Sequence, residues 1–448
     1  MPPRFILLLI ALLVWLAPLP PAEAATRIVK VVSPGGIEAW LVQEPSIPIL
    51  SLDVAWRNAG SKLDPPGKTG LANFAADLLD EGAGDLDAAA FHARVDDLGL
   101  GYDFNAGRDT FRASLRTLSE NRDAAWQLFS LAITRPRFDA EPMDRVRRQK
   151  LSEISRQEEE PETVASEALF AAAFPQHPYG QPPNGSAADL PRITRDDLQG
   201  FIRARLARDN MVIGVVGDIT PAELAPLLDR TFGALPAKAA AAAVADIVPA
   251  PGRAPEVITR DVPQSVIAFA GPGVKRSDPD FYAAYLLTHV LGADSLTSRL
   301  GRAVRVQRGL VYSIYLETVP YDQSALELGG FATRNEKVGE ALKLVRQVLA
   351  DVREYGITAA ELADAKTYLN GSFPLTLSSN ARIAGFLVTC QLDRLGMDYL
   401  DRRAKLIDAV TLDDINRVAR RLLDPEKLLV VVVGKPQGLG GSGAVSRP

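Results

Sequence analysis

The sequence predicts an α+β protein built from two homologous domains whose sheets are largely antiparallel. The first observation is an internal repeat, because residues 194–217 align without a gap to residues 411–434. Both segments begin with Thr-x-Asp-Asp, continue through an amphipathic helical pattern and end in an apolar strand that closes on Val-Val-Gly. The equal spacing of these parts favours an ancestral duplication over a coincidence between two common motifs.

The order of elements within each half is the second observation. Extended apolar runs open the halves at residues 47–56 and 265–271, and helical patterns follow at 70–79 and 280–291. Strands, helices, further strands, a helix and a last strand are the order of an α+β domain. We therefore expect domains over residues 25–236 and 255–437. A Pro- and Ala-rich linker at 237–254 joins them, and a disordered tail follows at 438–448.

The first 24 residues have the pattern of a secretory signal peptide. A basic start at Arg4 precedes an apolar run over residues 5–16 and a small-residue end at Ala22-Glu23-Ala24. This pattern predicts cleavage after Ala24 and a periplasmic or secreted protein, with no stable membrane insertion after the signal is removed. A retained membrane anchor is the alternative, although the apolar run is short for a span.

Composition excludes some classes of protein and of crosslink. The net charge of −5, from 50 basic and 55 acidic residues, argues against a nucleic-acid binder. A single cysteine, Cys390, excludes an intrachain disulfide. Its apolar surroundings favour a small buried side chain, so we expect packing to hold the fold.

A short helical segment carries the main functional signal. Within Lys68 to Gly84, KTGLANFAADLLDEGAG, apolar residues recur at the spacing of one helix face. Asn73, Ala76 and Asp77 fall on another face, with Asn73 and Asp77 one turn apart. The segment resembles the zinc-binding helix of the pitrilysin and insulysin family, the inverzincins, in which His-x-x-Glu-His holds Zn²⁺ and activates water. The resemblance places Asn73 and Asp77 at the two histidines and Ala76 at the glutamate.

The rest of the chain offers little to restore such a site. Glu153, in KLSEISRQEEEP, matches the family's third ligand and is retained. Asp77 and Glu153 could supply two oxygens, but Asn73 is a poor third ligand and Ala76 leaves no general base. Of the three histidines, His177 in FPQHPYG resembles a structural histidine of the family. We therefore predict no functional zinc site and no cofactor in this chain.

The second half resembles the part of the family's active site that lies opposite zinc. The segment SRLGRAVRVQRGLVYSIY, residues 298–315, resembles an element whose arginine and tyrosine fall on Arg305 and Tyr312. In the family's clamshell these side chains stabilise the oxyanion that forms at the substrate carbonyl. The alternative is a surface ion pair for Arg305 and a half-buried strand aromatic for Tyr312.

A peptide-binding strand is implied in the first half. The segment GLGYDFNAGRDTFRASLRTL resembles a strand-turn-strand of the family, in which the edge strand carrying Asn105 and Ala106 accepts an extended peptide by β-augmentation.

Together, these resemblances imply half of a clamshell, on the two-chain branch of the family that includes bacterial pairs and the mitochondrial processing peptidase. The leading hypothesis is a zinc-free subunit that completes a peptide chamber and lends Arg305 and Tyr312 to a homologous, zinc-bearing partner. The alternative is a non-catalytic peptide-binding or structural homodimer of the same fold. No Gly-x-Ser-x-Gly elbow supports a different hydrolase.

Overall fold

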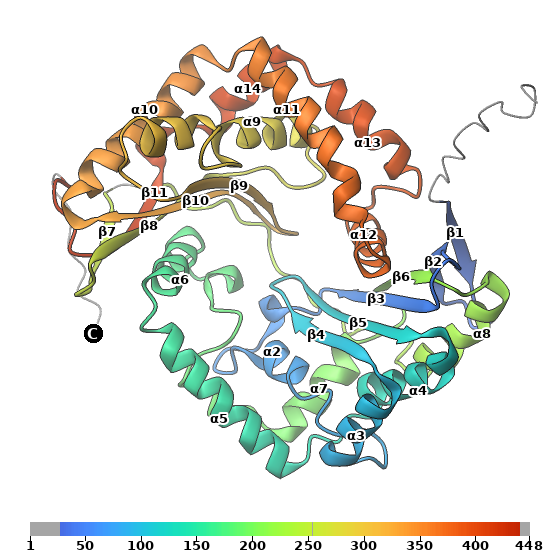
Figure 1. Cartoon of the computed structure of the whole chain (residues 1–448). Helices are drawn as coiled ribbons and strands as arrows, with labels where there is room; N and C mark the ends of the chain where they lie inside the picture. Colours follow the sequence, from blue (N-terminus) through green and yellow to red (C-terminus); the bar gives the residue numbers. More distant parts are fainter. Residues whose placement is uncertain (1–26, 253, 440–448) are drawn as a thin grey trace, which may run out of the picture.

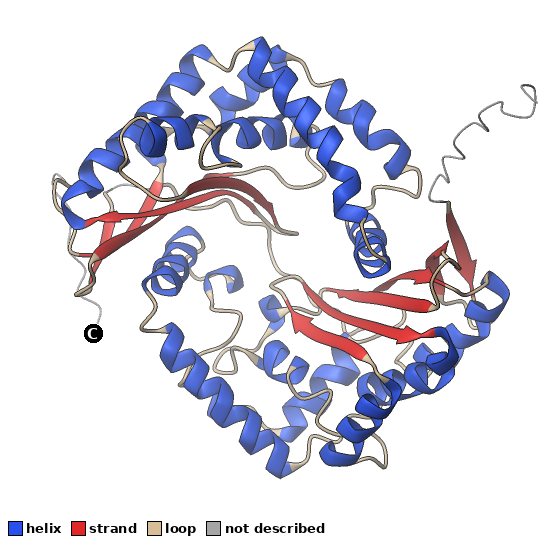
Figure 2. Ribbon diagram, viewed as in Figure 1, coloured by secondary structure: helices blue, strands red, loops and turns tan. Residues whose placement is uncertain are grey.

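The computed structural model describes residues 27–252 and 254–439 as two halves, each a sheet with helices on its outer side (Figures 1 and 2). The predicted signal peptide and the tail from residue 440 lie outside the described residues. No helix in the described part of the chain combines the length and apolar character needed to cross a membrane.

The N-terminal half contains a six-stranded sheet in the order β1-β2-β6-β3-β5-β4. Only the β2–β6 pair is parallel. The strands are β1 (Ile28–Val32), β2 (Glu38–Gln43), β3 (Ile49–Arg57), β4 (Gly101–Ala106), β5 (Thr110–Leu118) and β6 (Met211–Gly217). The helices are α2 (Leu71–Ala76), α3 (Ala88–Leu98), α4 (Arg122–Thr134), α5 (Ala140–Gln157), α6 (Pro161–Ala173), α7 (Arg195–Arg205) and α8 (Pro221–Phe232).

The C-terminal half contains a five-stranded sheet in the order β7-β11-β8-β10-β9. Its strands are β7 (Glu256–Thr259), β8 (Gln264–Pro272), β9 (Ile314–Pro320), β10 (Ala325–Arg334) and β11 (Leu429–Gly434). The helices are α9 (Phe281–Gly292), a π-helical turn η5 (Gly301–Val306), α10 (Val338–Tyr355), α11 (Ala359–Ser372), α12 (Asn380–Leu392), α13 (Tyr399–Asp408) and α14 (Leu412–Leu422).

The sequence repeat corresponds to a repeat of topology. The repeated segments form α7 with β6 and α14 with β11, and both helices begin with a capping box, made by Thr194 with Asp197 and by Thr411 with Asp414. Without β1, the two sheets have the same strand order, and β6 and β11 are each parallel to one neighbour and antiparallel to the other. The chain order then pairs α2 with α9, α5 with α11 and α6 with α12.

Each half lends one helix to the other half's sheet. Helix α6 packs against β8 and β11, and α12 packs against β3 and β6 (Figure 1). The second contact is close, because a Cβ at Gly214 in β6 would lie 2.5 Å from the carbonyl oxygen of Ala384 in α12. The Gln391 amide also donates to the Ile213 carbonyl over 2.9 Å. This exchange was not predicted from the sequence.

A buried lysine joins the two halves. Lys62 is only 3% exposed, and its ammonium lies 3.0 Å from Asp109 in the first half and 2.8 Å from Asp322 in the second. The Tyr179 hydroxyl donates to Asp109 over 2.6 Å and accepts the Gln323 backbone N–H over 3.1 Å. The network satisfies a charge that would otherwise be costly to bury.

The predicted linker is irregular but held in place. Backbone N–H groups of Ala240, Ile247 and Ala250 donate to carbonyls of Ala204, Gln323 and Ala173 over 2.8 to 3.0 Å. These acceptors lie on both sides of the junction, so this segment runs as a strap along the two halves.

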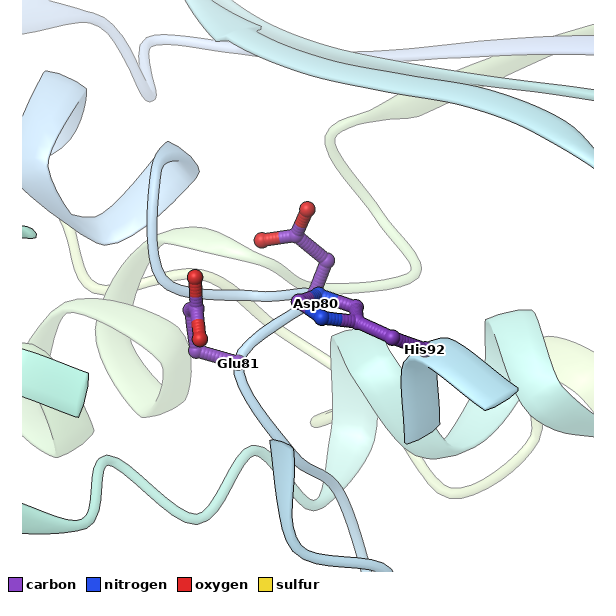
Figure 3. Close-up of side chains that lie close together, drawn as sticks. All are labelled: Asp80, Glu81 and His92. Carbon is purple, nitrogen blue, oxygen red and sulfur yellow. The ribbon is translucent and has the colours of Figure 1, made fainter. Parts of the chain in front are cut away.

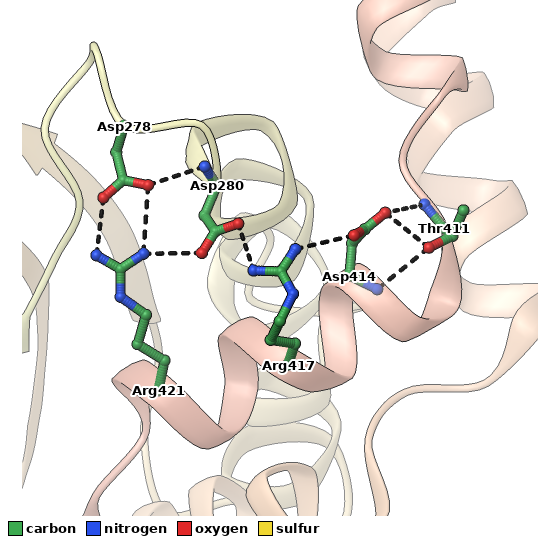
Figure 4. Close-up of polar contacts among 6 residues, drawn as sticks. All are labelled: Asp278, Asp280, Thr411, Asp414, Arg417 and Arg421. Atoms are coloured by element: carbon green, nitrogen blue, oxygen red, sulfur yellow. Dashed lines mark hydrogen bonds and ion pairs between the residues drawn. The ribbon is translucent and has the colours of Figure 1, made fainter.

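A surface network fastens the repeated helix of the C-terminal half (Figure 4). Arg421 bridges Asp278 and Asp280, at 2.7 and 2.8 Å, and Arg417 bridges Asp280 and Asp414, at 2.5 and 2.9 Å. Asp278 and Asp280 immediately precede α9. Their ion pairs with Arg417 and Arg421 therefore hold α14 against the start of that helix.

A carboxyl group buried beneath the second sheet gives a pH-dependent prediction. Burial raises the pKa of Glu327 from 4.5 to about 8, although the Thr288 and Thr318 hydroxyls bond to it and oppose this rise. Between about pH 4.5 and 8, the folded protein therefore keeps a proton that the unfolded chain loses. The free energy of unfolding should fall as the pH rises through this range. For one proton the slope is at most about 1.4 kcal/mol per pH unit.

Denaturant unfolding of wild type and Glu327→Gln across this pH range measures the effect. The variant should lose this part of the pH dependence, whereas Glu317→Gln, an exposed neighbour on β9, should retain it. Equal pH slopes in wild type and Glu327→Gln would contradict the assignment.

Candidate functional site

Helix α2 presents the degenerate motif in a rigid setting. Leu71, Phe74, Ala75, Leu78 and Leu79 are buried, as their spacing predicts. The helix is shorter than expected, since it ends at Ala76 and turns cover residues 77–80. It begins after Gly70, whose φ of 88° suits glycine and whose Cβ would lie 2.7 Å from the Asn184 carbonyl oxygen.

Asn73, at the first histidine position, acts as a crosslink. Its side-chain amide donates to the Ala106 carbonyl on β4 and to the Pro183 carbonyl, each over 2.9 Å. Both amide protons are therefore used in joining α2 to the edge strand and to the loop at residue 183. This structural role was not identified from the sequence.

Asp77, at the second histidine position, is bound by a lysine. Lys150 projects from α5, is 7% exposed, and places its ammonium 2.5 Å from the Asp77 carboxylate. A side-chain cation thus occupies the neighbourhood in which the family's motif would hold a metal. One feature of the sequence hinted at this contact: Lys150 lies one helical turn before Glu153, the retained position of the motif.

Asp77 and Lys150 are among the residues that line a polar cavity of about 380 Å³ between α2, β4 and α5. Lys150 is the one basic residue of this lining, and the acidic residues are more numerous. The lining residues are Ala76, Asp77, Asp80, Glu81, Tyr102, Asp103, Phe104, Val146, Gln149, Lys150 and Glu153.

The side chains at the motif positions do not fit a zinc ion. The Asn73 amide is engaged with two carbonyls, Asp77 is paired with Lys150, and Glu153 accepts a hydrogen bond from Gln157 over 2.9 Å. Ala76 supplies no base. Within the described residues, these positions do not form a group of three converging metal-ligand atoms.

One such group does occur nearby, formed by two residues of the cavity lining, Asp80 and Glu81, together with His92 from α3 (Figure 3). Ligand-type atoms of Asp80, Glu81 and His92 lie within 4.8 Å of one another. Glu81 is ion-paired with Arg145, and Asp80 accepts the Tyr102 hydroxyl over 3.2 Å. Burial, and then the charge of Glu81, raises the pKa of Asp80. Both carboxyl groups already have partners, so we interpret Asp80 and Glu81 as part of the cavity's polar wall.

The predicted peptide-binding strand lies at the edge of its sheet. Strand β4 pairs only with β5 among the described strands, and Asn105 is exposed. The Ala106 carbonyl, however, already accepts the Asn73 amide. A peptide that adds to this edge would therefore meet free backbone groups before Ala106.

The structure brings Arg305 and Tyr312 together. The Arg305 guanidinium carbon lies 5.0 Å from the centroid of the Tyr312 ring, and Tyr312 is 85% exposed. Arg305 lies in the π-helical turn η5, and such turns are frequent at functional sites. Tyr312 precedes β9 and is not half-buried, so the alternative assignment of this residue is wrong.

The two parts of the predicted site do not meet within one chain. Across residues 27–252 and 254–439, no hydrogen bond, ion pair or ring contact joins Arg305 or Tyr312 to Asn73, Ala76 or Asp77.

The two residues assigned to packing are in the expected settings. His177 is buried and caps a short 3-10 turn, accepting the Tyr179 N–H over 3.2 Å, while its other ring nitrogen lies 3.0 Å from the Ala245 carbonyl. Cys390 is buried in α12, and burial raises the pKa of its thiol to about 12.

Family models match most of the described chain. The model described as insulinase (peptidase family M16) matches residues 51–185, and the model described as the peptidase M16 inactive domain matches residues 192–369. The chain belongs to this family. As a member of the insulinase family it is of the inactive type, since its motif positions lack the zinc ligands and its C-terminal match is to the inactive domain.

Individual relatives cover nearly the whole chain. An uncharacterized zinc protease of Mycobacterium bovis is 26% identical over 90% of this chain and 92% of its own. The mitochondrial-processing peptidase subunit beta of Lentinula edodes is 24% identical over 87% and 86%. A crystal structure of a peptidase M16 inactive domain from Pseudomonas fluorescens has a TM-score of 0.85, with 29% identity over 94% of this chain and 99% of that one.

The Lys150 contact generates a prediction about zinc. Wild-type protein should contain no stoichiometric zinc. The variant Asn73→His/Ala76→Glu/Asp77→His restores the motif next to Glu153, but the Lys150 ammonium should repel the ion. Adding Lys150→Gln should therefore strengthen zinc binding by about tenfold or more, as measured by metal analysis and competition with a chromophoric chelator.

Lys30→Gln added to the same triple variant is the matched control, because Lys30 is an exposed lysine paired with Glu38. Stoichiometric zinc in clean wild-type protein, or no uptake by the quadruple variant, would contradict this account of the site.

Proposed function

We propose that this chain is the zinc-free subunit of a two-chain metallopeptidase and that it donates Arg305 and Tyr312 to a partner's zinc site. The observation that carries the proposal is the division of the site. The Arg305–Tyr312 pair is accessible, whereas the motif positions of the same chain are closed to metal by Lys150 and Asn73.

The chemistry of the pair suits an oxyanion. Arginine presents charged N–H donors in a fixed fork, and the tyrosine phenol adds one O–H donor. Stacking of the guanidinium over the Tyr312 ring restricts both side chains before substrate arrives, and this lowers the cost of ordering them. The high exposure of Tyr312 leaves its hydroxyl free to face another chain.

A homologous, zinc-bearing subunit is the partner that this proposal requires. It would supply the metal, its ligands and the general base, none of which the motif positions here provide. One relative is named as a subunit of a processing peptidase, which supports an assembly of two homologous chains. The predicted signal peptide supports an assembly in the periplasm.

Extended peptides are the proposed substrates. The exposed edge of β4 offers backbone groups to a peptide strand next to the acidic cavity. The peptide would be held mainly by its backbone, so the subunit would contribute binding that depends little on sequence.

A second candidate function uses the same strand without chemistry. The Lys150–Asp77 pair lies in a polar pocket beside the edge of β4, and these features suit a protein that, as a homodimer, would hold peptides without cleaving them. A stable homodimer that binds peptide and needs no second kind of chain would favour this function.

Removing the donors tests the proposal. In the purified complex, Arg305→Ala should lower kcat by about 10²- to 10³-fold, because a lost oxyanion donor weakens binding of the transition state. Tyr312→Phe should also lower kcat, since it removes only the hydroxyl. Size-exclusion chromatography of each variant should show that the complex stays assembled.

Tyr355→Phe is the matched control, because Tyr355 is also highly exposed but lies at the end of α10. Unchanged kinetics in an intact Arg305→Ala complex would make the pair structural and would refute the donated site.

A further inference from the structure

A second cavity lies in the C-terminal half, between α9 and α11. These helices are the topological counterparts of α2 and α5, so this cavity corresponds to the degenerate metal site of the other half. Its volume of about 680 Å³ compares with about 380 Å³ there, and no lysine lines it. The lining residues are Tyr285, His289, Val290, Ala293, Asp294, Thr297, Ser298, Arg302, Glu361, Asp364, Ala365, Tyr368, Leu369 and Ser372.

An aromatic surface forms part of this cavity. The rings of His289 and Tyr368 stack with centroids 5.0 Å apart and planes 28° from parallel. Tyr368 is 61% exposed, and Tyr285 lies one helical turn before His289. Burial lowers the pKa of His289, which favours a neutral imidazole near pH 7. The stacked pair thus offers a flat, uncharged surface to a planar ring.

Charged groups of both signs surround that surface. Asp294 accepts the N–H groups of Leu296 and Thr297, each over 2.8 Å, and these bonds lower its pKa and keep it anionic. Asp364 and Arg302 are exposed, and neither makes an ion pair in the described part of the chain. Glu361, by contrast, is neutralised by Arg299 at 2.7 and 2.8 Å.

We propose that this cavity binds a free aromatic amino acid in its zwitterionic form. The ring would stack on the open face of Tyr368, whose other face lies against His289, the ammonium would face Asp294 and Asp364, and the carboxylate would face Arg302. A cavity of this volume lies in the range of small-molecule sites, which combine apolar walls with a few polar groups. The site adjoins the Arg305–Tyr312 pair, because Arg302 and Arg305 share the turn η5 and the charge of Arg305 contributes to lowering the pKa of Asp294. The proposal does not depend on the proposed peptidase function.

Three probes with the same ring separate the two charges. L-tryptophan carries both charges, tryptamine lacks the carboxylate, and indole-3-propionate lacks the ammonium. Isothermal titration of the mature full-length chain should show that L-tryptophan binds about tenfold or more tightly than either analogue. With only three histidines in the chain, His289 can be assigned by loss of its imidazole signal in His289→Gln. L-tryptophan should shift that signal in the NMR spectrum of the wild type.

Matched variants assign each contact. Tyr368→Ala should weaken L-tryptophan binding by about tenfold or more, whereas Tyr355→Ala, which removes an exposed tyrosine elsewhere, should not. Asp364→Asn should weaken binding of L-tryptophan and tryptamine but not of indole-3-propionate, and Arg302→Gln should show the opposite selectivity. The proposal is overturned if L-tryptophan does not bind, if it binds Tyr368→Ala as well as wild type, or if the three probes bind equally.

Discussion

The buried ammonium of Lys62 is the interaction on which the arrangement of the two halves depends. It is shared between Asp109 in the first half and Asp322 in the second, with Tyr179 and Gln323 completing the network. Removing one member of a buried ion pair typically costs about 3 to 5 kcal/mol, and less where a partner is exposed, as Asp322 is here. The exchange of α6 and α12 adds apolar contact on both sides of this junction. The degenerate motif positions in the first half and the Arg305–Tyr312 pair in the second therefore lie on one connected scaffold.

Pairing of a lysine with carboxylates also explains how the region around the degenerate motif is held together without a metal. In an acidic cavity, a fixed positive charge offsets the repulsion between carboxylates. Lys150 supplies that charge from α5, and Asn73 makes hydrogen-bonded crosslinks from α2 to the neighbouring strand and loop. The pocket is present at the motif positions, although Ala76 supplies no general base. The C-terminal half shows a different outcome of the duplication, because the corresponding cavity there is larger and no lysine lines it.

Much of the fold could be predicted from the sequence because periodic patterns and caps act locally. The apolar face of α2, the repeated capping boxes at Thr194 and Thr411, and the strand runs of each half all depend on residues close together in the chain. The pairing of Lys150 with Asp77 and the exchange of α6 and α12 could not be predicted, because they join segments far apart. The early end of α2 after Ala76 was also missed, since the apolar pattern continues to Leu79 although the N–H groups of Leu78 and Leu79 bond three residues back, to Ala75 and Ala76.

We propose that this chain has no hydrolytic site of its own and completes the site of a partner. The most direct measurement is peptide hydrolysis by this protein alone, by a homologous zinc-bearing subunit alone and by the two mixed, with metal content determined on each sample. We expect activity only in the mixture, with zinc only in the partner. Chelator-sensitive hydrolysis by this protein alone would contradict it.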